Sequence, residues 1–191
     1  MSGVVVGEDG LARCGWAVSS ETMQVYHDVE WGRRVSDERG LFERLTLEAF
    51  QSGLAWATVL RKRDRFREVF ADFEPATVAS FDGAKVATLL EDVGIIRNRT
   101  KIEATIANAG AVLRLDGGFA DLVWSFAPGP RPRPRSTADV PAVTAESKAM
   151  AAELKRHGFV FVGPTTAYAL MQATGMVDDH LEDCHVRTSE S

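Results

Sequence analysis

The stretch GIIRNRTKIEATIANA, residues 94–109, decides how the chain is expected to fold. Its apolar residues recur at the spacing of one helix face, which predicts a helix over about 99–115 with Ile102, Ile106 and Ala109 inward. Cations crowd the start of this helix, where the helix dipole favours acids: Arg97, Arg99 and Lys101. The amides of such a glycine turn can hold a DNA phosphate. A solvated hairpin is the alternative.

Helical patterns extend on both sides of this stretch. Ser36 and Asp37 can cap a helix that carries Leu41 and Leu45 and stops near Gly53. Further helices are expected over about 56–70, from Pro75 or Asp82 to Gly94, over 144–158 and over 166–175. The run 159–162 is interpreted as an extended lead-in to the last helix. These patterns predict an all-α fold, an orthogonal bundle.

The charge balance limits the class of protein. The 191 residues hold 22 Lys and Arg against 27 Asp and Glu, a formal net charge of -5. This length predicts one domain, and the acidic balance excludes a protein that coats nucleic acid by bulk charge. Residues 61–67 nevertheless contain five cations and one acid. Such a run is typical of a solvated helix face, and beside a phosphate site it would extend the footprint on DNA.

Cysteine usage predicts the compartment. Cys14 and Cys184 are the only cysteines, which excludes a secreted disulfide framework and predicts a reduced, intracellular protein. The N-terminus lacks the basic start of a signal peptide, and no run approaches the roughly 18 apolar residues of a membrane span. We therefore expect a soluble, cytoplasmic protein that makes no membrane contact.

Glu48 lies on the apolar stripe of the helix predicted after Asp37. A carboxylate in that position must find a partner or shift its pKa. In one interpretation it turns to the helix edge and pairs with Arg44. In the other it faces a pocket built by Leu54 together with Trp56 and other aromatic residues, where it can bind a cationic or hydrogen-bond-donating ligand.

Residue types that bind metals occur in pairs near the two ends of the chain: Cys14 with His27, and His180 with Cys184. Two thiolates and two imidazoles would complete a tetrahedral zinc site that ties the ends together. Such a site is structural, because four protein ligands leave no open position for a zinc hydrolase. The alternatives are two buried, unliganded cysteines, or His185 as the ligand beside Cys184.

Residues 128–135, with the sequence PGPRPRPR, form the one stretch of biased composition. Prolines at alternate positions remove backbone donors and favour extended neighbours, which predicts a semi-rigid surface connection. A proline-motif ligand is the alternative.

Several runs, taken together and in order, resemble the bacterial DNA-3-methyladenine glycosylase I family. They are RCGW at 13–16, YHDVEWG at 26–32, LFERLTLEAFQSGLAW at 41–56, the stretch at 94–109, VWSF at 123–126, GFVFVGPTTAYALMQATGMVDDH at 158–180, and Cys184. The resemblance implies a helix-hairpin-helix DNA glycosylase fold with two helical lobes over 13–187. It leaves residues 1–12 as an extension expected to be flexible, the Pro/Arg loop over 128–143, and a tail over 188–191.

The resemblance also implies roles for individual residues. A structural zinc ion would be held by Cys14, His27, His180 and Cys184. The base pocket would consist of the catalytic Glu48 with Trp16, Tyr26, Trp56 and Met23. Two of this chain's residues depart from the family pattern: Met23 replaces a second pocket Tyr, and Ala55 replaces a Ser. DNA would be contacted by the wedge residues Gln51, Gly53 and Leu54 and by the hairpin residues Gly94, Ile96, Arg97, Arg99 and Lys101.

The activity implied by the resemblance is the first step of base excision repair. The enzyme would flip 3-methyladenine out of alkylated duplex DNA and hydrolyse its N-glycosidic bond, leaving an abasic site. The pocket-forming runs hold no lysine for a Schiff base, so we expect a monofunctional glycosylase without lyase activity. We expect it to act as a monomer. A non-catalytic DNA-binding module is the alternative, but it would have no reason to place Glu48 beside Trp56.

Overall fold

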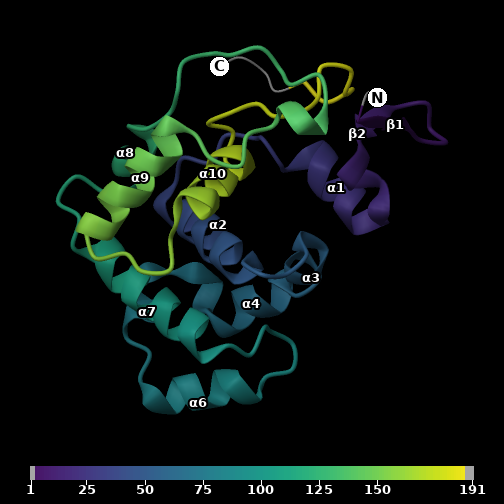
Figure 1. Cartoon of the computed structure of the whole chain (residues 1–191). Helices are drawn as coiled ribbons and strands as arrows, with labels where there is room; N and C mark the ends of the chain where they lie inside the picture. Colours follow the sequence, from purple (N-terminus) through teal and green to yellow (C-terminus); the bar gives the residue numbers. More distant parts are fainter. Residues whose placement is uncertain (1–2, 188–191) are drawn as a thin grey trace.

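The structure is a computed structural model that describes residues 3–187 (Figure 1). Helix α2 runs through its centre, with α3, α7, α8 and α10 packed against it. The α-helices are α1 (Glu21–Val29), α2 (Glu38–Gln51), α3 (Trp56–Leu60), α4 (Arg63–Val69), α5 (Pro75–Ala79), α6 (Gly83–Glu91), α7 (Arg99–Leu113), α8 (Phe119–Trp124), α9 (Ala145–Arg156) and α10 (Pro164–Ala173). Short 3-10 helices cover Gly15–Ser19, Ala71–Phe73 and Thr137–Asp139.

The main predicted helices form where their capping residues place them. Asp37, Asp82, Asn98 and Thr144 each accept a hydrogen bond from a backbone amide in the first turn of the helix that follows. Residues 159–162 form the predicted irregular lead-in to α10. The predicted fold is confirmed as mainly helical.

Three features differ from the prediction. The helix expected over 56–70 is divided into α3 and α4, because the chain turns at Arg61 and Lys62 before Phe66 enters the core. Helices α1 and α8 were not predicted: α1 carries the site residues Tyr26 and His27 within a polar stretch, and α8 has only six residues.

Helix α2 is buried on nearly every side and carries much of the core. Leu41, Phe42, Leu45, Leu47 and Phe50 are all fully buried, and α2 contacts α3, α7, α8 and α10. Burying each such side chain stabilises the fold by roughly 1.5–3 kcal/mol. A helix held this firmly on all sides can fix the position of Glu48, which it also carries.

The N-terminal segment is structured where it is described. Strand β1 (Val4–Val6) pairs antiparallel with β2 (Ala12–Cys14), with Val4 opposite Cys14. The backbone amide of His185 then donates to the Ala12 carbonyl at 2.7 Å, which attaches the C-terminal segment to the hairpin. The expected flexible extension over 1–12 therefore contains a strand, and this hairpin is the exception to an all-α fold within 3–187. Residues 1–2 and the predicted tail at 188–191 lie outside the described residues.

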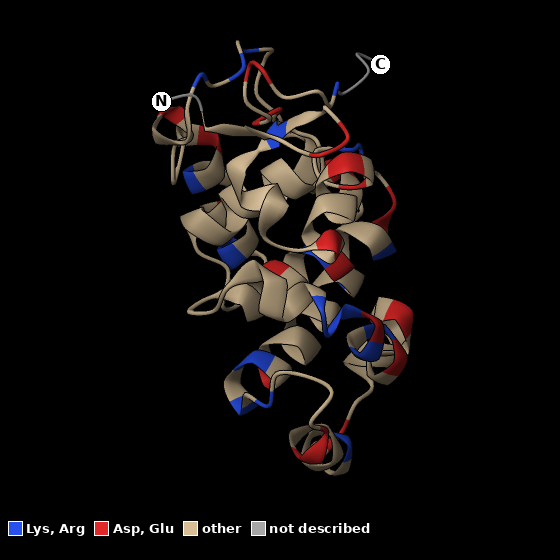
Figure 2. Cartoon of the chain, turned by 90° about the vertical axis from the view of Figure 1, so that its right-hand side faces the viewer, with Lys and Arg blue, Asp and Glu red and all other residues tan. Residues whose placement is uncertain are grey.

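The hairpin and the C-terminal segment lie at the same end of the molecule, so the two ends of the chain meet there (Figure 1). Figure 2 shows Lys and Arg interspersed with Asp and Glu over the visible helices. Among the described residues, no helix is both long and apolar enough to cross a membrane.

Candidate active site and metal centre

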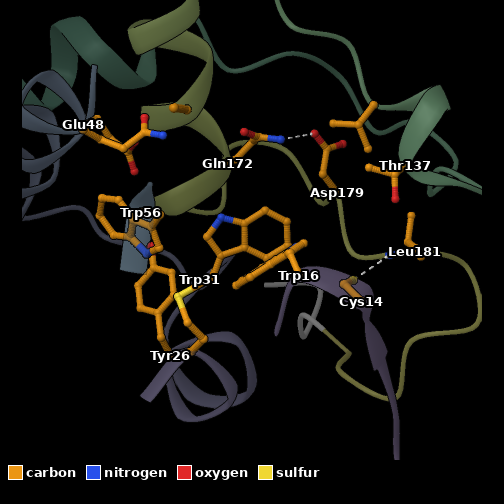
Figure 3. Close-up of a pocket in the computed structure, with 14 residues that line it drawn as sticks. Cys14, Trp16, Tyr26, Trp31, Glu48, Trp56, Thr137, Gln172, Asp179 and Leu181 are labelled. Atoms are coloured by element: carbon orange, nitrogen blue, oxygen red, sulfur yellow. Dashed lines mark hydrogen bonds between the residues drawn. The ribbon is translucent and has the colours of Figure 1, made fainter. Parts of the chain in front are cut away.

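A cavity of about 310 Å³ opens between α1, α2, α3, α10 and the C-terminal segment (Figure 3). Seven residues of the predicted site line it: Cys14, Trp16, Met23, Tyr26, Glu48, Gln51 and Trp56. Sequence reasoning missed other lining residues, including Trp31, Thr137, Gln172, Asp179 and Leu181. These missed residues come from segments far apart in the chain, and only the fold brings them to one cavity.

Aromatic rings form much of the cavity wall. The rings of Tyr26 and Trp56 lie 5.4 Å apart between centroids at an angle of 44°. Those of Trp16 and Trp31 meet edge to face at 5.0 Å. Ring faces of this kind suit a flat, electron-poor ring, because an indole face attracts positive charge.

Glu48 is buried in this cavity without a partner of its own. Arg44, which could have paired with it, instead bonds Glu30 at 3.0 Å, and Arg63 bonds the same carboxylate. Within residues 3–187 no hydrogen bond or ion pair reaches Glu48. Burial raises the pKa of Glu48 to about 8, and the nearby charge of Arg44 opposes that rise only in part. The geometry favours the pocket interpretation of Glu48 over the pairing with Arg44.

Trp56 adds a hydrogen-bond donor at the same end of the cavity. Its indole Nε1 is buried and has no hydrogen-bond partner within residues 3–187. Leaving such groups unpaired costs free energy, on the order of 1–3 kcal/mol for each. A ligand that offers donors to Glu48 and an acceptor to Trp56 would recover that cost.

A second cluster lies behind the aromatic wall, at the junction of the chain ends. Cys14, His27 and Cys184 are buried, and their ligand atoms lie within 4.8 Å of one another. His27 Nε2 lies 3.5 Å from Cys184 Sγ, while its Nδ1 lies 2.7 Å from Asp28 Oδ1. Arg13 holds Asp28 in turn, at 3.0 Å. This carboxylate-to-histidine arrangement is typical of protein metal sites, and the cluster can hold a metal ion.

The lowered pKa of Cys184 favours metal binding at this cluster. The hydrogen bond from Cys14 and that from His27 hold the pKa of the Cys184 thiol well below its usual range, despite burial. Burial acts to lower the pKa of His27, but hydrogen bonds to Cys184 and Asp28 outweigh it and raise that pKa. The thiolate of Cys184 is the form that binds a metal. The contact with Cys184 and burial raise the pKa of Cys14, so Cys14 and His27 would each release a proton when a metal binds.

His180, the fourth predicted ligand, is adjacent to the cluster but outside the set within 4.8 Å. Its ring centroid lies 5.0 Å from that of His27. Its Nδ1 lies 3.0 Å from Asp178 Oδ1, and its buried Nε2 has no hydrogen-bond partner among the residues that the structure describes. A buried imidazole nitrogen left unpaired in this place fits the role of a further ligand. His185, the alternative ligand, lies against Asp28 at 3.1 Å.

The predicted wedge forms an exposed turn directly after α2. Gly53 has φ 81°, which glycine adopts without strain, and the Leu54 side chain is exposed. The Gln51 amide donates to the Leu54 carbonyl at 3.3 Å and lines the cavity from this turn. The turn therefore connects the cavity with the protein surface.

The predicted hairpin consists of α6, a turn through Gly94 and Ile96, and α7. Arg97 and Arg99 are exposed, and Arg99 makes only an exposed ion pair with Glu103 at 3.2 Å. Both arginines are therefore available to an anion.

Lys101 differs from these arginines because its charge is used inside the protein. It is buried, and its Nζ donates to the carbonyls of Phe50 at 2.8 Å and Ser52 at 2.6 Å. Its predicted role as a DNA contact does not fit this geometry, since these bonds cap the end of α2 and fix the wedge turn. Burial also lowers the pKa of Lys101.

Lys101→Met is expected to lower the free energy of unfolding by about 1–3 kcal/mol, because it leaves two carbonyls without a donor. The salt dependence of DNA binding should stay unchanged. Arg97→Gln is the matched variant: it should leave stability unchanged and reduce the slope of log K against log salt by about one. Urea unfolding and binding titrations at several salt concentrations measure both quantities. A reduced salt slope in Lys101→Met would restore Lys101 as a phosphate contact.

The basic run at 61–67 is mostly neutralised within the fold. Four of its five cations have protein partners: Lys62 with the Val93 carbonyl, Arg63 with Glu30, Arg65 with Glu68 and Asp92, and Arg67 with Glu43 and Asp64. Arg61 is exposed. This run resembles the solvated helix face more than an extended DNA footprint.

Comparisons with known proteins show similarity over almost the whole chain. The sequence model described as methyladenine glycosylase matches residues 16–188. The DNA-3-methyladenine glycosylase of Haemophilus influenzae is 42% identical over 183 residues, covering 93% of this chain and 98% of that protein. DNA-3-methyladenine glycosylase 1 of Escherichia coli K12 is 42% identical over 179 residues, covering 91% and 96%.

Solved structures give the same result. A crystal structure of 3-methyladenine DNA glycosylase I superposes with a TM-score of 0.87 at 43% identity, covering 91% of this chain and 98% of that chain. The Staphylococcus aureus 3-methyladenine DNA glycosylase I, studied for its recognition of 3-methyladenine, gives 0.88 at 30% identity, covering 94% and 98%. On sequence and fold together, this chain belongs to the methyladenine glycosylase family.

Proposed function

We propose that this chain is a DNA repair glycosylase that removes 3-methyladenine from alkylated DNA. Glu48 carries the proposal: a desolvated carboxylate without a protein partner, enclosed by aromatic rings and beside an unpaired indole N–H. Such a pocket suits a flat, cationic heterocycle with polar edges. The family's relatives bear the name of this same activity.

The chemistry of the methylated base explains why so few groups suffice. Methylation at N3 spreads a positive charge over the adenine ring and weakens its glycosidic bond before the protein acts. Such a leaving group needs little general-acid help. The protein must mainly extract the nucleotide, recognise the cation and admit water to the sugar. Extrusion costs a few kcal/mol, and stacking on each aromatic side chain returns roughly 1–3 kcal/mol.

We assign the roles within this reaction as follows. Glu48 accepts hydrogen bonds from the adenine edge and stabilises its charge, and Trp56, Tyr26 and Trp16 enclose the ring. Met23, buried at the cavity wall, fills space there without offering a hydroxyl. The wedge at Gln51, Gly53 and Leu54 replaces the extruded base in the duplex. The hairpin at Gly94 and Ile96, with Arg97 and Arg99, holds the DNA backbone.

The product would be an abasic site. No lysine is among the described residues that line the cavity, so no Schiff base to the sugar can form there. The reaction is therefore hydrolysis alone, in the cytoplasm, where the two thiols stay reduced.

We propose further that the cluster at the chain ends holds one zinc ion. Cys14, His27 and Cys184 would bind it, with His180 Nε2 as the fourth ligand, a donor set typical of structural zinc. Bound there, the ion would supply cross-linking of the chain ends and no catalysis, because all four positions are taken by the protein. It would hold the Trp16 segment and the C-terminal segment, which both line the cavity, in fixed positions.

A single assay tests the proposed function. Alkylated duplex DNA is incubated with the protein, and released 3-methyladenine is measured by chromatography. We expect free base and intact strands that break only after alkaline treatment. Strand cleavage without alkali would indicate a lyase. Tight DNA binding without base release would indicate a non-catalytic module.

The raised pKa of Glu48 predicts how stability depends on pH. Because the folded protein binds the Glu48 proton more tightly than the unfolded chain, this group's stabilising contribution is complete below pH 4.5 and is lost as pH rises to about 8. Glu48→Gln removes this loss. The free energy of urea unfolding of the variant relative to the native protein should therefore increase between pH 5 and pH 9, by on the order of 4 kcal/mol. Parallel profiles for the two proteins would contradict the burial of an unpaired carboxyl.

A further inference from the structure

The segment at 128–135, which we call the Pro/Arg strap, is bound to the C-terminal segment by a series of ion pairs. Its alternate arginines pair with successive acids: Arg131 with Asp179, Arg133 with Asp178 at 2.6 Å, and Arg135 with Glu182 at 3.4 Å. The Glu182 amide also donates to the Pro134 carbonyl at 2.9 Å. Alternation places these arginines on one side of an extended chain. The strap is therefore attached to the segment that carries His180 and Cys184.

Arg131 reaches the wall of the active-site cavity through Asp179. The Asp179 side chain is 1% exposed and lines the cavity. Its carboxylate accepts hydrogen bonds from Arg131, from the Tyr168 hydroxyl at 2.6 Å and from Gln172 Nε2 at 2.8 Å. A buried carboxylate needs such compensation, and Arg131 is the cation that supplies it.

Gln172 is the group that this network orients. The Gln172 amide nitrogen donates to Asp179 Oδ2, so this nitrogen faces Asp179. The carbonyl Oε1 of Gln172 then points away from Asp179, and within residues 3–187 it accepts no hydrogen bond. Figure 3 shows Gln172 at the cavity wall between Asp179 and Glu48, with the dashed bond on the Asp179 side. Gln172 Oε1 therefore presents a hydrogen-bond acceptor of fixed orientation to the cavity, in addition to Glu48.

We propose that Gln172 is a specificity-determining residue and that Arg131 is the positioning residue that fixes its orientation. The Oε1 atom of Gln172 accepts a hydrogen bond from the extruded nucleotide or from its attacking water. This inference rests on the proposed function, since it assigns a second acceptor to the same cavity. In both cases the group that bonds to Gln172 Oε1 is an N–H or O–H donor. The donor is either an N–H of the methylated base or the O–H of the water that attacks the sugar.

Gln172→Met tests the acceptor, because it keeps the length of the side chain and removes both amide atoms. We expect the single-turnover rate of 3-methyladenine excision to fall roughly three- to tenfold, the effect of one hydrogen bond. Affinity for duplex DNA that contains an abasic site should stay unchanged. Arg131→Met should lower the excision rate to a similar extent, and Arg131→Lys should restore part of it.

Arg135→Gln is the matched control. Arg135 lies in the same strap, but its side chain is 85% exposed and its partner Glu182 does not line the cavity. The excision rate of Arg135→Gln should equal that of the native protein. Since Arg131→Met leaves a buried carboxylate without its cation, a double variant with Asp179→Asn removes both charges and keeps the test possible if the single variant fails to fold.

Binding of free 3-methyladenine, followed by tryptophan fluorescence, distinguishes the two donors. If Gln172→Met weakens this binding, the donor belongs to the base. If excision slows while binding of the free base is unchanged, the donor is the attacking water. Native excision rates in Gln172→Met would overturn the proposal, as would equal rates in Arg131→Met and Arg135→Gln. An inactive native protein would instead overturn the proposed function.

Discussion

Glu48→Gln is expected to lower the single-turnover rate of 3-methyladenine excision by at least about a hundredfold. The Glu48 carboxyl is buried, lines the cavity and has no hydrogen-bond or ion-pair partner within residues 3–187, so a cationic base that binds beside it favours its charged form and meets no competing partner. Gln keeps the size of the side chain and one acceptor oxygen but carries no charge. The charge contribution, which grows as the base becomes enclosed, is lost.

Affinity for duplex DNA that contains an abasic site should change by less than about threefold in this variant. That ligand lacks the base, so its binding depends on the phosphate contacts and the wedge. A gel-shift titration on abasic duplex DNA, beside excision on alkylated duplex DNA, measures both effects. Equal losses in the two assays would make Glu48 a scaffold residue.

Glu43→Gln is the matched control for this substitution. Glu43 lies on the same helix, but it pairs with Arg67 at 2.7 Å and does not line the cavity. Its replacement should leave excision unchanged. Stability should also separate the two variants: above pH 8, Glu48→Gln should be more stable than the native protein, because it removes a buried, unpaired charge. The buried Glu48 therefore lowers the stability of the fold while it serves recognition of the base.

The sequence was most informative where local rules decide the structure. Asp37 caps α2 as predicted, because a side-chain oxygen followed by a helical stripe is a local signal. The apolar stripe also indicated that Glu48 would be buried. Spacing could not show that Glu30 takes the guanidinium of Arg44, since Glu30 lies outside α2.

The parts that sequence reasoning missed depend on contacts between distant segments. Lys101 has the same position in its helix as a phosphate-binding cation, and only the fold places the end of α2 above its ammonium. Asp179 and Gln172 come together because the segment after α10 returns to the end of that helix. The strand at Val4–Val6 is too short to show alternation and forms by pairing with β2.

Cys184→Ser is expected to lose a stoichiometric zinc ion and to lower the midpoint of thermal unfolding by on the order of 10 °C. Cys14, His27 and Cys184 come from β2, α1 and the C-terminal segment, so one ion would join three otherwise separate parts of the chain. Without it, the remaining ligands Cys14, His27 and His180 are buried with no ion to bind, and the chain ends lose their cross-link. Zinc content by atomic spectrometry and thermal unfolding by circular dichroism measure the two effects.

His185→Gln separates the proposed ligand set from the neighbouring one. His27, Asp28 and His185 also lie close enough together to hold an ion. If Cys14, His27, His180 and Cys184 are the ligands, His185→Gln retains zinc and His180→Gln binds it more weakly. If His185→Gln instead loses zinc and His180→Gln retains it, the ion is bound by His27, Asp28 and His185. Because the proposed ion has no open position, Cys184→Ser should still excise 3-methyladenine at temperatures below its unfolding transition. Complete loss of excision in a folded, zinc-free variant would contradict a purely structural role.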